Sequence, residues 1–403
     1  MSRVPRIRFK GFEEDWEQRK LGEVCNIITK QTGFDYSSTI KPALLKEKAD
    51  DSYPFIQNKD FNGTKINMDT DFFIPIDIAE KFPNIVLDRS SILISISGRI
   101  GNVGFYSSEH KAFIGGAVGI CKLKYDNDGE FIIHELESEY GQKYFYSLIK
   151  ASSHANITVE DIRNMELIFP EKKEEKICIS TFFSSFNHLI TLHQRKLEKL
   201  KIIKKSMLEN LFPQNGEKTP KIRFSGFTED WEQRKTSDLF KITRGYVLAA
   251  NITATNKSGD NPYPVYSSQT KDNGLMGYYK DYLYENAITW TTDGANAGTV
   301  NYRGEKFYCT NVCGVLLGDK VTPNQMLAEA INNVAKDHVS YVGNPKLMNN
   351  VMAEICIWLP SEDTERRAIS TFVYSIDHLI TLHQSKLEKL QKIKKSMLES
   401  MFV

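Results

Sequence analysis

Residues 181–212 read TFFSSFNHLITLHQRKLEKLKIIKKSMLENLF, and residues 371–402 read TFVYSIDHLITLHQSKLEKLQKIKKSMLESMF. The two stretches are identical at 23 of 32 positions, which indicates an internal duplication. In both stretches apolar residues recur in alternating steps of four and three, the pattern of a coiled-coil seam. We therefore expect a long helix that occurs twice and organises the rest of the chain.

The predicted seam has matching positions in the two copies: Phe186, Ile190, His193, Leu197, Leu200, Met207 and Leu211, and Ile376, Ile380, His383, Leu387, Leu390, Met397 and Met401. Lys204 and Lys394 interrupt the two seams at the same point, and polar seam residues favour one register at a cost in stability. If each helix begins just after Pro170 or Pro360, it has about 42 residues and is about 60 Å long. Each helix could instead pack only on its own domain, but two matched seams favour pairing, within one chain or between two.

A second repeated block opens each half of the chain. Residues 5–20 read PRIRFKGFEEDWEQRK and residues 220–235 read PKIRFSGFTEDWEQRK, identical at 13 of 16 positions. The opening blocks are offset by 215 residues and the helices by 190, so the stretch between them is 25 residues shorter in the second half. The ends of the two halves are therefore duplicated, whereas the middles have diverged.

Each middle combines predicted strands with a helix. The first contains SSILISISG from Ser90, GGAVGICKLK from Gly115, a helix-like SEYGQKYFYSLI from Ser138 and a last strand ending at Pro170. The second repeats this order with different residues. We predict an α+β chain of two mixed α/β domains with curved sheets, joined by two long antiparallel helices as a pseudo-twofold repeat. The segments are an opening block 1–20, a first domain 21–170, a helix 171–212, a linker and second block 213–235, a second domain 236–360 and a last helix 361–403.

Composition sets broad limits on function. The 403 residues are 41% hydrophobic and 26% charged with a formal charge of +1, so any site for a polyanion has to be a local basic face. The six cysteines are scattered without a C-x-x-C pair, which fits reduced thiols and predicts no structural metal. No apolar run approaches membrane-spanning length, and the polar start has no signal-peptide core, so we expect a cytoplasmic protein.

The sequence contains no catalytic motif that we recognise. It has neither a phosphate-binding G-x-x-x-x-G-K-[ST] loop nor a G-x-G-x-x-G dinucleotide turn. Asn261-Pro262-Tyr263-Pro264 lacks the second proline of the amino-methyltransferase tetrapeptide, and we interpret it as a turn. Glu174-Glu175-Lys176 has a spacing found in nucleases, but a charged helix start is the better explanation. We expect no catalytic and no metal-binding residues, and a self-contained nuclease is the weakest hypothesis.

Polar loops in both middles are the candidate binding elements. Short polar side chains can hydrogen-bond to base edges, and Lys and Arg can contact guanine and phosphate, although ordinary turns need the same residues. The candidates are Lys30, Gln31, Thr32, Ser95, Ser97, Arg99, Asn102, Arg244, Tyr246, Ser267, Ser268, Gln269, Lys271, Thr291, Thr292, Asn296, Thr310 and Asn311.

Taken together, these blocks resemble the specificity subunit of type I restriction-modification enzymes. The resemblance rests on PxIRFxGFxEDWEQRK, on P-x-x-x-x-E-x-x-x-I-S-T-F from Pro170 and again from Pro360, and on HLITLHQxKLEKL, and it spans essentially the whole chain. It implies two target-recognition domains, each binding one half of a bipartite DNA site, with the helices as an antiparallel spacer. It also implies two methyltransferase subunits and restriction endonuclease/translocase subunits as partners. S-adenosylmethionine, ATP and magnesium would then bind to those partners, and none to this chain.

This arrangement would let one chain contact two separated half-sites on double-stranded DNA, with major grooves about 34 Å apart per turn. Because the two middles differ, the half-sites should differ too. The alternative is a non-catalytic coiled-coil scaffold that binds proteins through its middles and does not recognise DNA. Steep weakening of DNA binding by salt would separate the two hypotheses.

Overall fold

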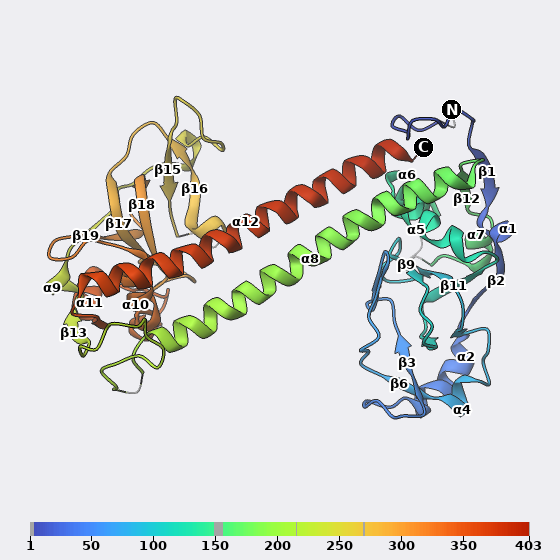
Figure 1. The fold of residues 1–403 in the computed structure, drawn as a ribbon, viewed down its shortest axis with the longest axis horizontal. Coiled ribbons are helices and arrows are strands. Elements are labelled where there is room, and N and C mark those ends of the chain that lie inside the picture. The colour runs from blue at the N-terminus through green and yellow to red at the C-terminus, as the bar shows by residue number, and fades with distance from the viewer. Residues whose placement is uncertain (1–3, 149–155, 215, 269–270, 403) are drawn as a thin grey trace. The chain divides into compact units, whose positions relative to one another are not determined.

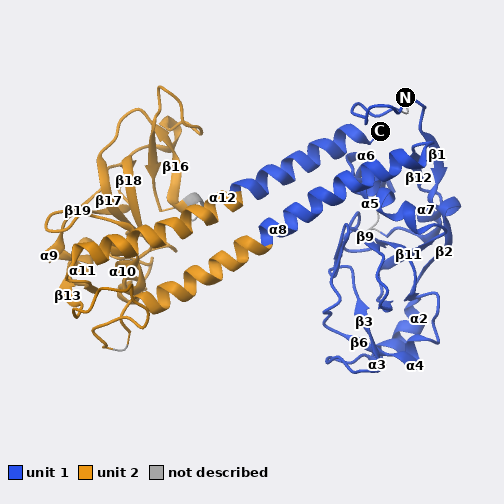
Figure 2. Cartoon of the chain, in the orientation of Figure 1, with its two compact units in different colours: residues 1–194, 385–403 blue, residues 195–384 orange. Residues whose placement is uncertain are grey.

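The computed structural model describes residues 4–148, 156–214, 216–268 and 271–402, with the side chains of Lys271 and Asp272 excepted. The chain forms two compact units (Figure 2). Unit 1 comprises residues 1–194 and 385–403, and unit 2 comprises residues 195–384. Each unit therefore contains one domain of mixed α/β structure together with part of each long helix. The boundaries predicted for the six sequence segments stay a prediction.

The two long helices are α8 (Lys173–Leu211) and α12 (Asp363–Met401), each of 39 residues (Figure 1). Both begin three residues beyond the prolines, slightly later than predicted, after a short bend. Acidic residues occupy both first turns, where they favour the positive end of the helix dipole. Two long helices combined with two sheet-containing domains confirm the predicted fold class.

Within each unit the two helix segments run antiparallel. In unit 1 the ring of Phe183, near the start of α8, lies 5.8 Å from the ring of Phe402, just after α12. Further along α8, Gln194 lines one groove with Gln391. In unit 2 the same relation holds with the helices exchanged, since Leu211 at the end of α8 shares a core with residues near the start of α12, including Ile369 and Val373.

All predicted seam residues are buried or half-buried. Both seam lysines bind a carboxylate of the adjoining domain, and Lys204 also binds Asp377 on α12. Lys204 Nζ lies 3.0 Å from Glu329 and 2.8 Å from Asp377, and Lys394 Nζ lies 3.0 Å from Glu137. The ion pairs of Lys204 and Lys394 therefore hold each domain against a long helix. The seam pattern alone does not predict these contacts with the domains.

The duplicated opening blocks make the same contacts in both units. Arg8 binds Glu175 through Nε and Nη2 at 2.6 and 2.8 Å, and Arg223 binds Glu365 at 2.7 and 2.8 Å. Both glutamates are fully buried near the start of a long helix. Because a buried charge needs a partner, these pairs explain why the block and the helix were duplicated together.

The blocks also contact the far end of the other long helix. The Ile7 amide donates to the Ser400 carbonyl at 3.0 Å, and the Ile222 amide donates to the Asn210 carbonyl at 3.0 Å. A buried tryptophan follows in each block, Trp16 in one core and its counterpart in the other. Each block thus joins the start of one long helix to the end of the other.

The domain of unit 1 contains two four-stranded sheets, with orders β2-β11-β8-β9 and β6-β3-β10-β7, and the short pairs β1-β12 and β4-β5. Strands β3 and β10 are parallel and the other pairs are antiparallel. The elements are β1 (Glu17–Lys20), α1 (Leu21–Val24), β2 (Cys25–Lys30), α2 (Gly33–Asp35), α3 (Lys41–Ala43), β3 (Ser52–Ile56), β4 (Phe61–Asn62), β5 (Lys65–Ile66), β6 (Phe73–Pro75), α4 (Ile76–Ala79), β7 (Val86–Leu87), β8 (Ser91–Ser95), β9 (Val103–Tyr106), β10 (Ala112–Ile114), β11 (Val118–Leu123), α5 (Gly129–Glu137), α6 (Glu139–Leu148), α7 (Val159–Arg163) and β12 (Glu166–Phe169).

The domain of unit 2 follows the same order with one continuous sheet of six strands, β14-β19-β17-β18-β15-β16, and the pair β13-β20. Its elements are β13 (Glu232–Lys235), α9 (Thr236–Leu239), β14 (Phe240–Arg244), β15 (Tyr263–Tyr266), β16 (Leu275–Tyr279), β17 (Tyr284–Thr291), β18 (Val300–Cys309), β19 (Cys313–Gly318), α10 (Gln325–Ala335), α11 (Asn349–Glu354) and β20 (Cys356–Leu359). The long β18 pairs with β17 along most of its length and with β15 at its end, whereas unit 1 divides these roles between β9 and β10.

The predicted strands of the middles are present, for example β8, β11, β17 and β19. The helix expected from Ser138 is α6, but a more deeply buried helix, α5, precedes it. The hydrophobic core of unit 1 extends from α5 over the sheet to α8 and the end of α12. None of the described helices is long and apolar enough to cross a membrane.

Candidate nucleic-acid interface

The candidate residues of unit 1 lie where three strands reach one edge of a sheet. Lys30 ends β2 and pairs with Gly119, while Ser95 ends β8 and pairs with Val118. The Ser95 amide donates a hydrogen bond to the Asn102 carbonyl at 2.9 Å, which closes the following turn. Residues 30–32, 95–99 and 102 are thereby brought to the same edge.

Two of these side chains already have structural partners. Asn102 Nδ2 donates to the carbonyls of Asn58 and Phe61 at 2.8 and 3.0 Å. Thr32 caps α2, because its hydroxyl accepts a hydrogen bond from the Asp35 amide. These contacts explain Asn102 and Thr32 as loop-forming residues. Lys30 and Arg99 are exposed, and Ser97 is half-buried.

Gln31 and Ser95 differ from the others because their polar atoms are buried without partners. Gln31 is 7% exposed, and neither its amide nitrogen nor its amide oxygen has a hydrogen-bond partner among the described residues. The hydroxyl of the fully buried Ser95 also lacks a partner in that part of the chain. Leaving a buried polar group unpaired typically costs about 1–3 kcal/mol.

In unit 2 four loops meet at the corresponding edge. Thr310 Oγ1 donates to Ser267 Oγ at 3.0 Å, and Asn296 Nδ2 donates to the Ser268 carbonyl at 3.0 Å. The Tyr246 amide donates to the Cys309 carbonyl at 3.1 Å. These bonds bring together the ends of β14, β15, β17 and β18.

The remaining candidates of unit 2 lie along the same edge. Thr291 and Thr292 are buried, with the Thr292 hydroxyl donating to Asp293, while Arg244 and Asn311 are exposed. Tyr246 is 63% exposed. Gln269 lies outside the described residues, and the side chain of Lys271 is not described either.

A β-bulge reveals which candidates of the two units are equivalent. In unit 1 Leu123 pairs with Cys25 and Lys122 with Ile27, so β2 gains one residue that β14 lacks. Beyond the bulge Lys30 pairs with Gly119 as Arg244 pairs with Gly314.

The neighbouring strand pair matches as well. Ser95 lies opposite Val118 as Thr291 lies opposite Cys313. Each unit therefore has a cation and a hydroxyl at matched positions of one sheet edge. The bulge hides this match from a comparison of sequences at constant spacing.

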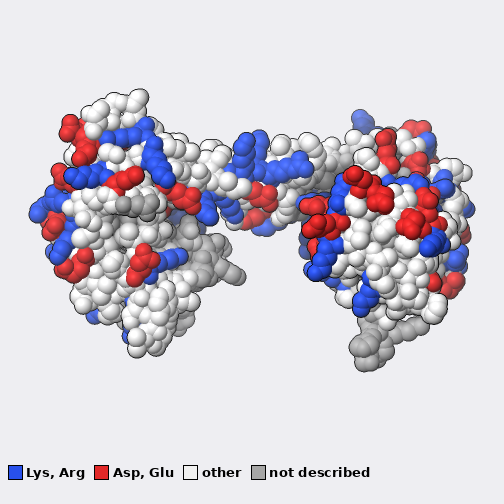
Figure 3. Space-filling model, turned by 90° about the horizontal axis from the view of Figure 1, so that it is seen from below, with Lys and Arg blue, Asp and Glu red and all other residues white. Residues whose placement is uncertain are grey.

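Charge is mixed on the face shown in Figure 3, where basic and acidic side chains are interspersed on both units. This agrees with the formal charge of +1 and leaves local cations as the means of attracting a polyanion. Among the described residues, no group of three or more His, Cys, Asp or Glu side chains is arranged to hold a metal ion.

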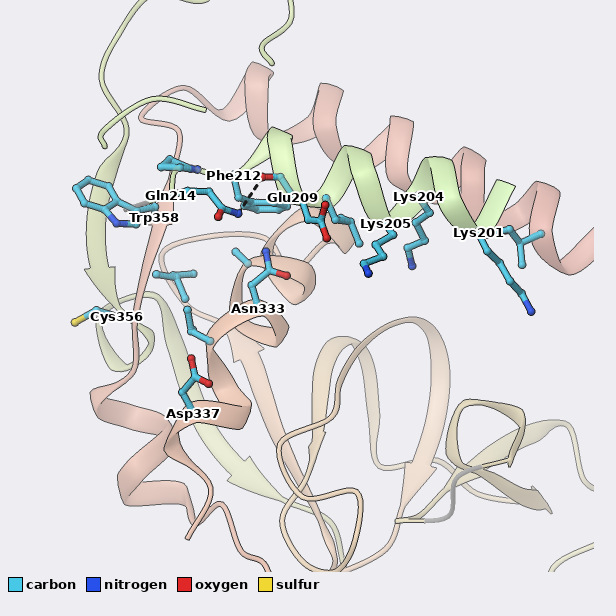
Figure 4. Close-up of a pocket in the computed structure, with 16 residues that line it drawn as sticks. Lys201, Lys204, Lys205, Glu209, Phe212, Gln214, Asn333, Asp337, Cys356 and Trp358 are labelled. Carbon is cyan, nitrogen blue, oxygen red and sulfur yellow. Dashed lines mark hydrogen bonds between the residues drawn. The ribbon is translucent and has the colours of Figure 1, made fainter. Parts of the chain in front are cut away.

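A separate groove of about 780 Å³ lies in unit 2 between the last turns of α8, α10 and β20 (Figure 4). Lys201, Lys204 and Lys205 line it from α8, and Asn333 and Trp358 from the domain. Burial acts to lower the pKa of Lys204, but Glu329 and Asp377 outweigh it and raise that pKa. None of the predicted binding residues lines this groove.

Sequence reasoning missed a buried arginine, Arg303 on β18. It is 7% exposed and lies beside a cavity of about 120 Å³ that Ser267, Thr291 and Asn296 also line. The only signal in the sequence is a charged residue inside an otherwise strand-like stretch, which does not distinguish an inward from an outward side chain.

Comparisons with known proteins identify the family. A family model described as the type I restriction modification DNA specificity domain matches residues 13–202 and again residues 228–392. These matches cover most of the chain, and the chain belongs to this family.

Two relatives come from Mycoplasma pneumoniae. One, named as the N-terminus of a type I specificity subunit, is 43% identical over 125 residues, which are 30% of this chain and 65% of that protein. Another protein named as a type I specificity subunit is 31% identical over 231 residues, 56% of this chain and 80% of the relative.

The fold is also found in a solved structure. The crystal structure of the S subunit of a type I restriction-modification system from M. genitalium aligns with a TM-score of 0.73, covering 99% of both chains at 16% identity. At this identity the alignment describes the fold alone.

Proposed function

We propose that this chain is the DNA-recognition subunit of a type I restriction-modification enzyme, and that each unit binds one half of an asymmetric, bipartite double-stranded target. The observation that carries the proposal is the matched placement of Lys30 with Arg244 and of Ser95 with Thr291 at one sheet edge in each unit. The side chains around these positions differ between the units, which favours two unlike half-sites.

The two kinds of residue suit different parts of DNA. Exposed Lys and Arg side chains neutralise phosphates, and this fixes position without reading sequence. Ser, Thr, Asn and Gln side chains hydrogen-bond to base edges in the major groove and supply discrimination. Both kinds are present at each edge, so each unit has the chemistry for positioning and for recognition.

The partners are two methyltransferase subunits and the restriction subunits of the complex. The supporting observation is a pair of exposed apolar positions that the duplication repeats. Leu189 and Leu379 are each 42% exposed, and Leu192 and Leu382 are 38% and 39% exposed. Identical surfaces on the two long helices suit two copies of one partner.

Methylation and cleavage would then occur on those partners. S-adenosylmethionine, ATP and magnesium would bind there, while this chain is non-catalytic and works in the cytoplasm with the DNA it recognises. Metal-dependent cleavage by the purified chain alone would contradict this division of labour.

The test is to exchange residues 21–170 for the corresponding domain of a different family member and to map methylated sites in the host genome. We expect one half of the methylated sequence to change and the other half to stay. The same mapping in a host without the chain should show loss of the motif. A change in both halves would contradict one domain per half-site.

A second measurement addresses DNA binding itself. In the presence of the methyltransferase, binding to duplex DNA should weaken steeply with salt, because phosphate contacts release counterions. A chain that assembles with the methyltransferase and leaves DNA binding unchanged would instead act as a scaffold.

A further inference from the structure

The two sheets differ at three matched positions next to the candidate edge. Leu93 and Gly104 lie opposite each other in unit 1, where Thr289 and Asn301 lie opposite each other in unit 2. Two residues along the strand, Tyr106 takes the place that Arg303 has in unit 2. The second domain is therefore polar where the first is largely apolar.

In unit 1 this place is filled by hydrocarbon. Phe61 packs directly on Gly104, where a side-chain carbon would lie 2.7 Å from the phenyl ring. Phe61, Leu93 and Tyr106 belong to one hydrophobic core. No comparable space is left beside Gly104, because any larger residue there would collide with the ring.

In unit 2 the same place is a cavity of about 120 Å³. Thr289, Thr299, Asn301 and Arg303 line it together with three polar residues of the candidate edge: Ser267, Thr291 and Asn296. The volume corresponds to about four water molecules at 30 Å³ each. We name it the Arg303 cavity.

Arg303 is held rigidly in this cavity. Its guanidinium carbon lies 3.5 Å from the centre of the Tyr266 ring, Nη2 donates to the Asn273 carbonyl at 2.5 Å, and Nε donates to Thr289 Oγ1 at 3.3 Å. Stacking and hydrogen bonds of this kind fix the plane of the guanidinium and leave its remaining N–H groups in a set direction.

The charge of Arg303 has no ion-pair partner among the described residues. The nearby carboxylate of Glu305 accepts a hydrogen bond from the Tyr266 hydroxyl at 2.5 Å instead. Burial lowers the pKa of Arg303. Buried cations are normally paired, because removing a charge from water is costly. Lys122 in unit 1, a buried cation of comparable depth, has such a partner in Asp88 at 2.9 Å.

We propose that the Arg303 cavity binds a phosphate oxyanion, and that in the DNA complex this is a backbone phosphate of the half-site bound by unit 2. A planar guanidinium with hydroxyl and amide donors around it matches phosphate oxygens. Ser267, Thr291 and Asn296 join the cavity to the candidate edge, so the phosphate arrives with the DNA. The DNA source rests on the proposed function, whereas oxyanion binding does not.

The first arm of the test uses free inorganic phosphate and the full chain at constant ionic strength. Trp290 lines the cavity and its fluorescence provides a readout beside calorimetry. We expect saturable binding that weakens at least tenfold in Arg303→Met. Thr289→Leu, which introduces the residue of the first domain, should weaken it similarly and guards against misfolding of the arginine variant. Lys122→Met, which removes the paired cation of unit 1, should bind phosphate like the unaltered chain.

The second arm measures duplex DNA binding by the complex with the methyltransferase over a range of salt concentrations. Losing one phosphate contact should reduce the slope of log affinity against log salt by about 0.9 in Arg303→Met. Affinity should fall about tenfold, the size expected for one charge-assisted hydrogen bond.

The outcomes separate the two claims. Equal phosphate binding by the unaltered chain and Arg303→Met, or none by either, would overturn the cavity as an oxyanion site. Loss of phosphate binding with an unchanged DNA slope would overturn the DNA source and leave a site for free phosphate. If the complex did not recognise DNA at all, the proposed function would fail while the first arm still decided the cavity.

Discussion

Lys30 and Arg244 are exposed cations at the ends of matched strands, and neither side chain has an ion-pair partner among the described residues. Gly119 and Gly314, which have no side chain, lie opposite them on the adjacent strand. Such a cation is available to a phosphate and gives up no existing bond when DNA arrives.

We expect Lys30→Ala and Arg244→Ala each to lower the salt slope of DNA binding by about 0.9, with additive effects in the double variant. The loss should be similar for all sequences, because phosphate contacts carry no sequence information. Salt titrations of DNA binding by the methyltransferase complex measure both the slope and the loss of affinity. Lys241→Ala, which removes an exposed cation near the other end of β14, is the control and should change the slope less. Equal slopes for all variants would exclude these two residues as phosphate contacts.

The sequence selects candidates that lie along one sheet edge in each unit, but it does not rank them, and their role in binding stays a prediction. The turn composition of the sequence selects Thr32, Asn102 and Gln31 equally as candidate binding residues, since all three are polar loop residues. Only the contacts separate them, because Thr32 and Asn102 already have protein partners and Gln31 has none. Arg303 could not be found at all, because its neighbours are brought together by strand register.

The duplicated block and the long helix are joined by buried ion pairs. Arg8→Ala would leave the fully buried Glu175 without its partner, and Arg223→Ala would do the same to Glu365. We expect each change to destabilise its own unit by about 3–5 kcal/mol. Urea unfolding followed by near-ultraviolet circular dichroism measures the loss.

Arg19→Ala is the matched control, because Arg19 pairs with Glu17 on the surface. Such exposed pairs contribute about 0–1 kcal/mol. A loss as small for Arg8→Ala as for Arg19→Ala would mean that the buried pair does not fasten the block to the helix.

The junction between α12 and the domain of unit 1 should weaken in acid. Burial raises the pKa of Glu137, but His134 and Lys394 outweigh it and hold that pKa below the ordinary value of 4.5. A lowered folded-state pKa gives stability that is complete above pH 4.5 and is lost as the pH falls below it. The charge-assisted bond to Lys394 is worth about 1.5–3 kcal/mol.

Hydrogen exchange of the last turns of α12 at pH 7 and pH 4 measures this dependence. In Glu137→Gln, the amides in the last turns of α12 should exchange faster at pH 7 than in the unaltered chain. Their protection should also differ less between pH 7 and pH 4. An unaltered chain with equal protection at both pH values would show that the Glu137 charge does not hold the helix.

At the scale of elements, the helices were more predictable than the sheets. A seam repeated every three or four residues over 32 positions is a local pattern, and prolines limit where each helix starts. The helix α5 was missed because residues 129–137 are buried almost all round, and a short buried helix cannot be distinguished from a buried strand by its apolar residues. Strands were visible as short apolar runs, but the bulge in β2 depends on which partner lies beside it.

On the scale of the whole molecule, the repeated leucines predict how many partners assemble. Leu189→Asp should reduce the methyltransferase bound from two copies to one, and Leu379→Asp should do the same, because each change alters one of two equivalent surfaces. The double variant should bind neither copy. Native mass spectrometry of the purified complex gives the stoichiometry directly.

Both leucines are 42% exposed, so a charge there should leave the fold intact. Val342→Asp, at a residue that is 93% exposed and outside the repeat, is the control and should keep both partners. Full assembly of the double variant would place the methyltransferase elsewhere.

Unit 1 is assembled from two separate stretches of sequence, whereas unit 2 is the continuous stretch 195–384, and this affects the order in which the chain can fold during synthesis. The domain of unit 1 leaves the ribosome first, but its core includes Leu398, Met401 and Phe402. Unit 2 has all its residues once residue 384 has emerged. Unit 2, which is translated second, can thus complete its core first. The core of unit 1 stays incomplete until the last turns of α12 have been translated.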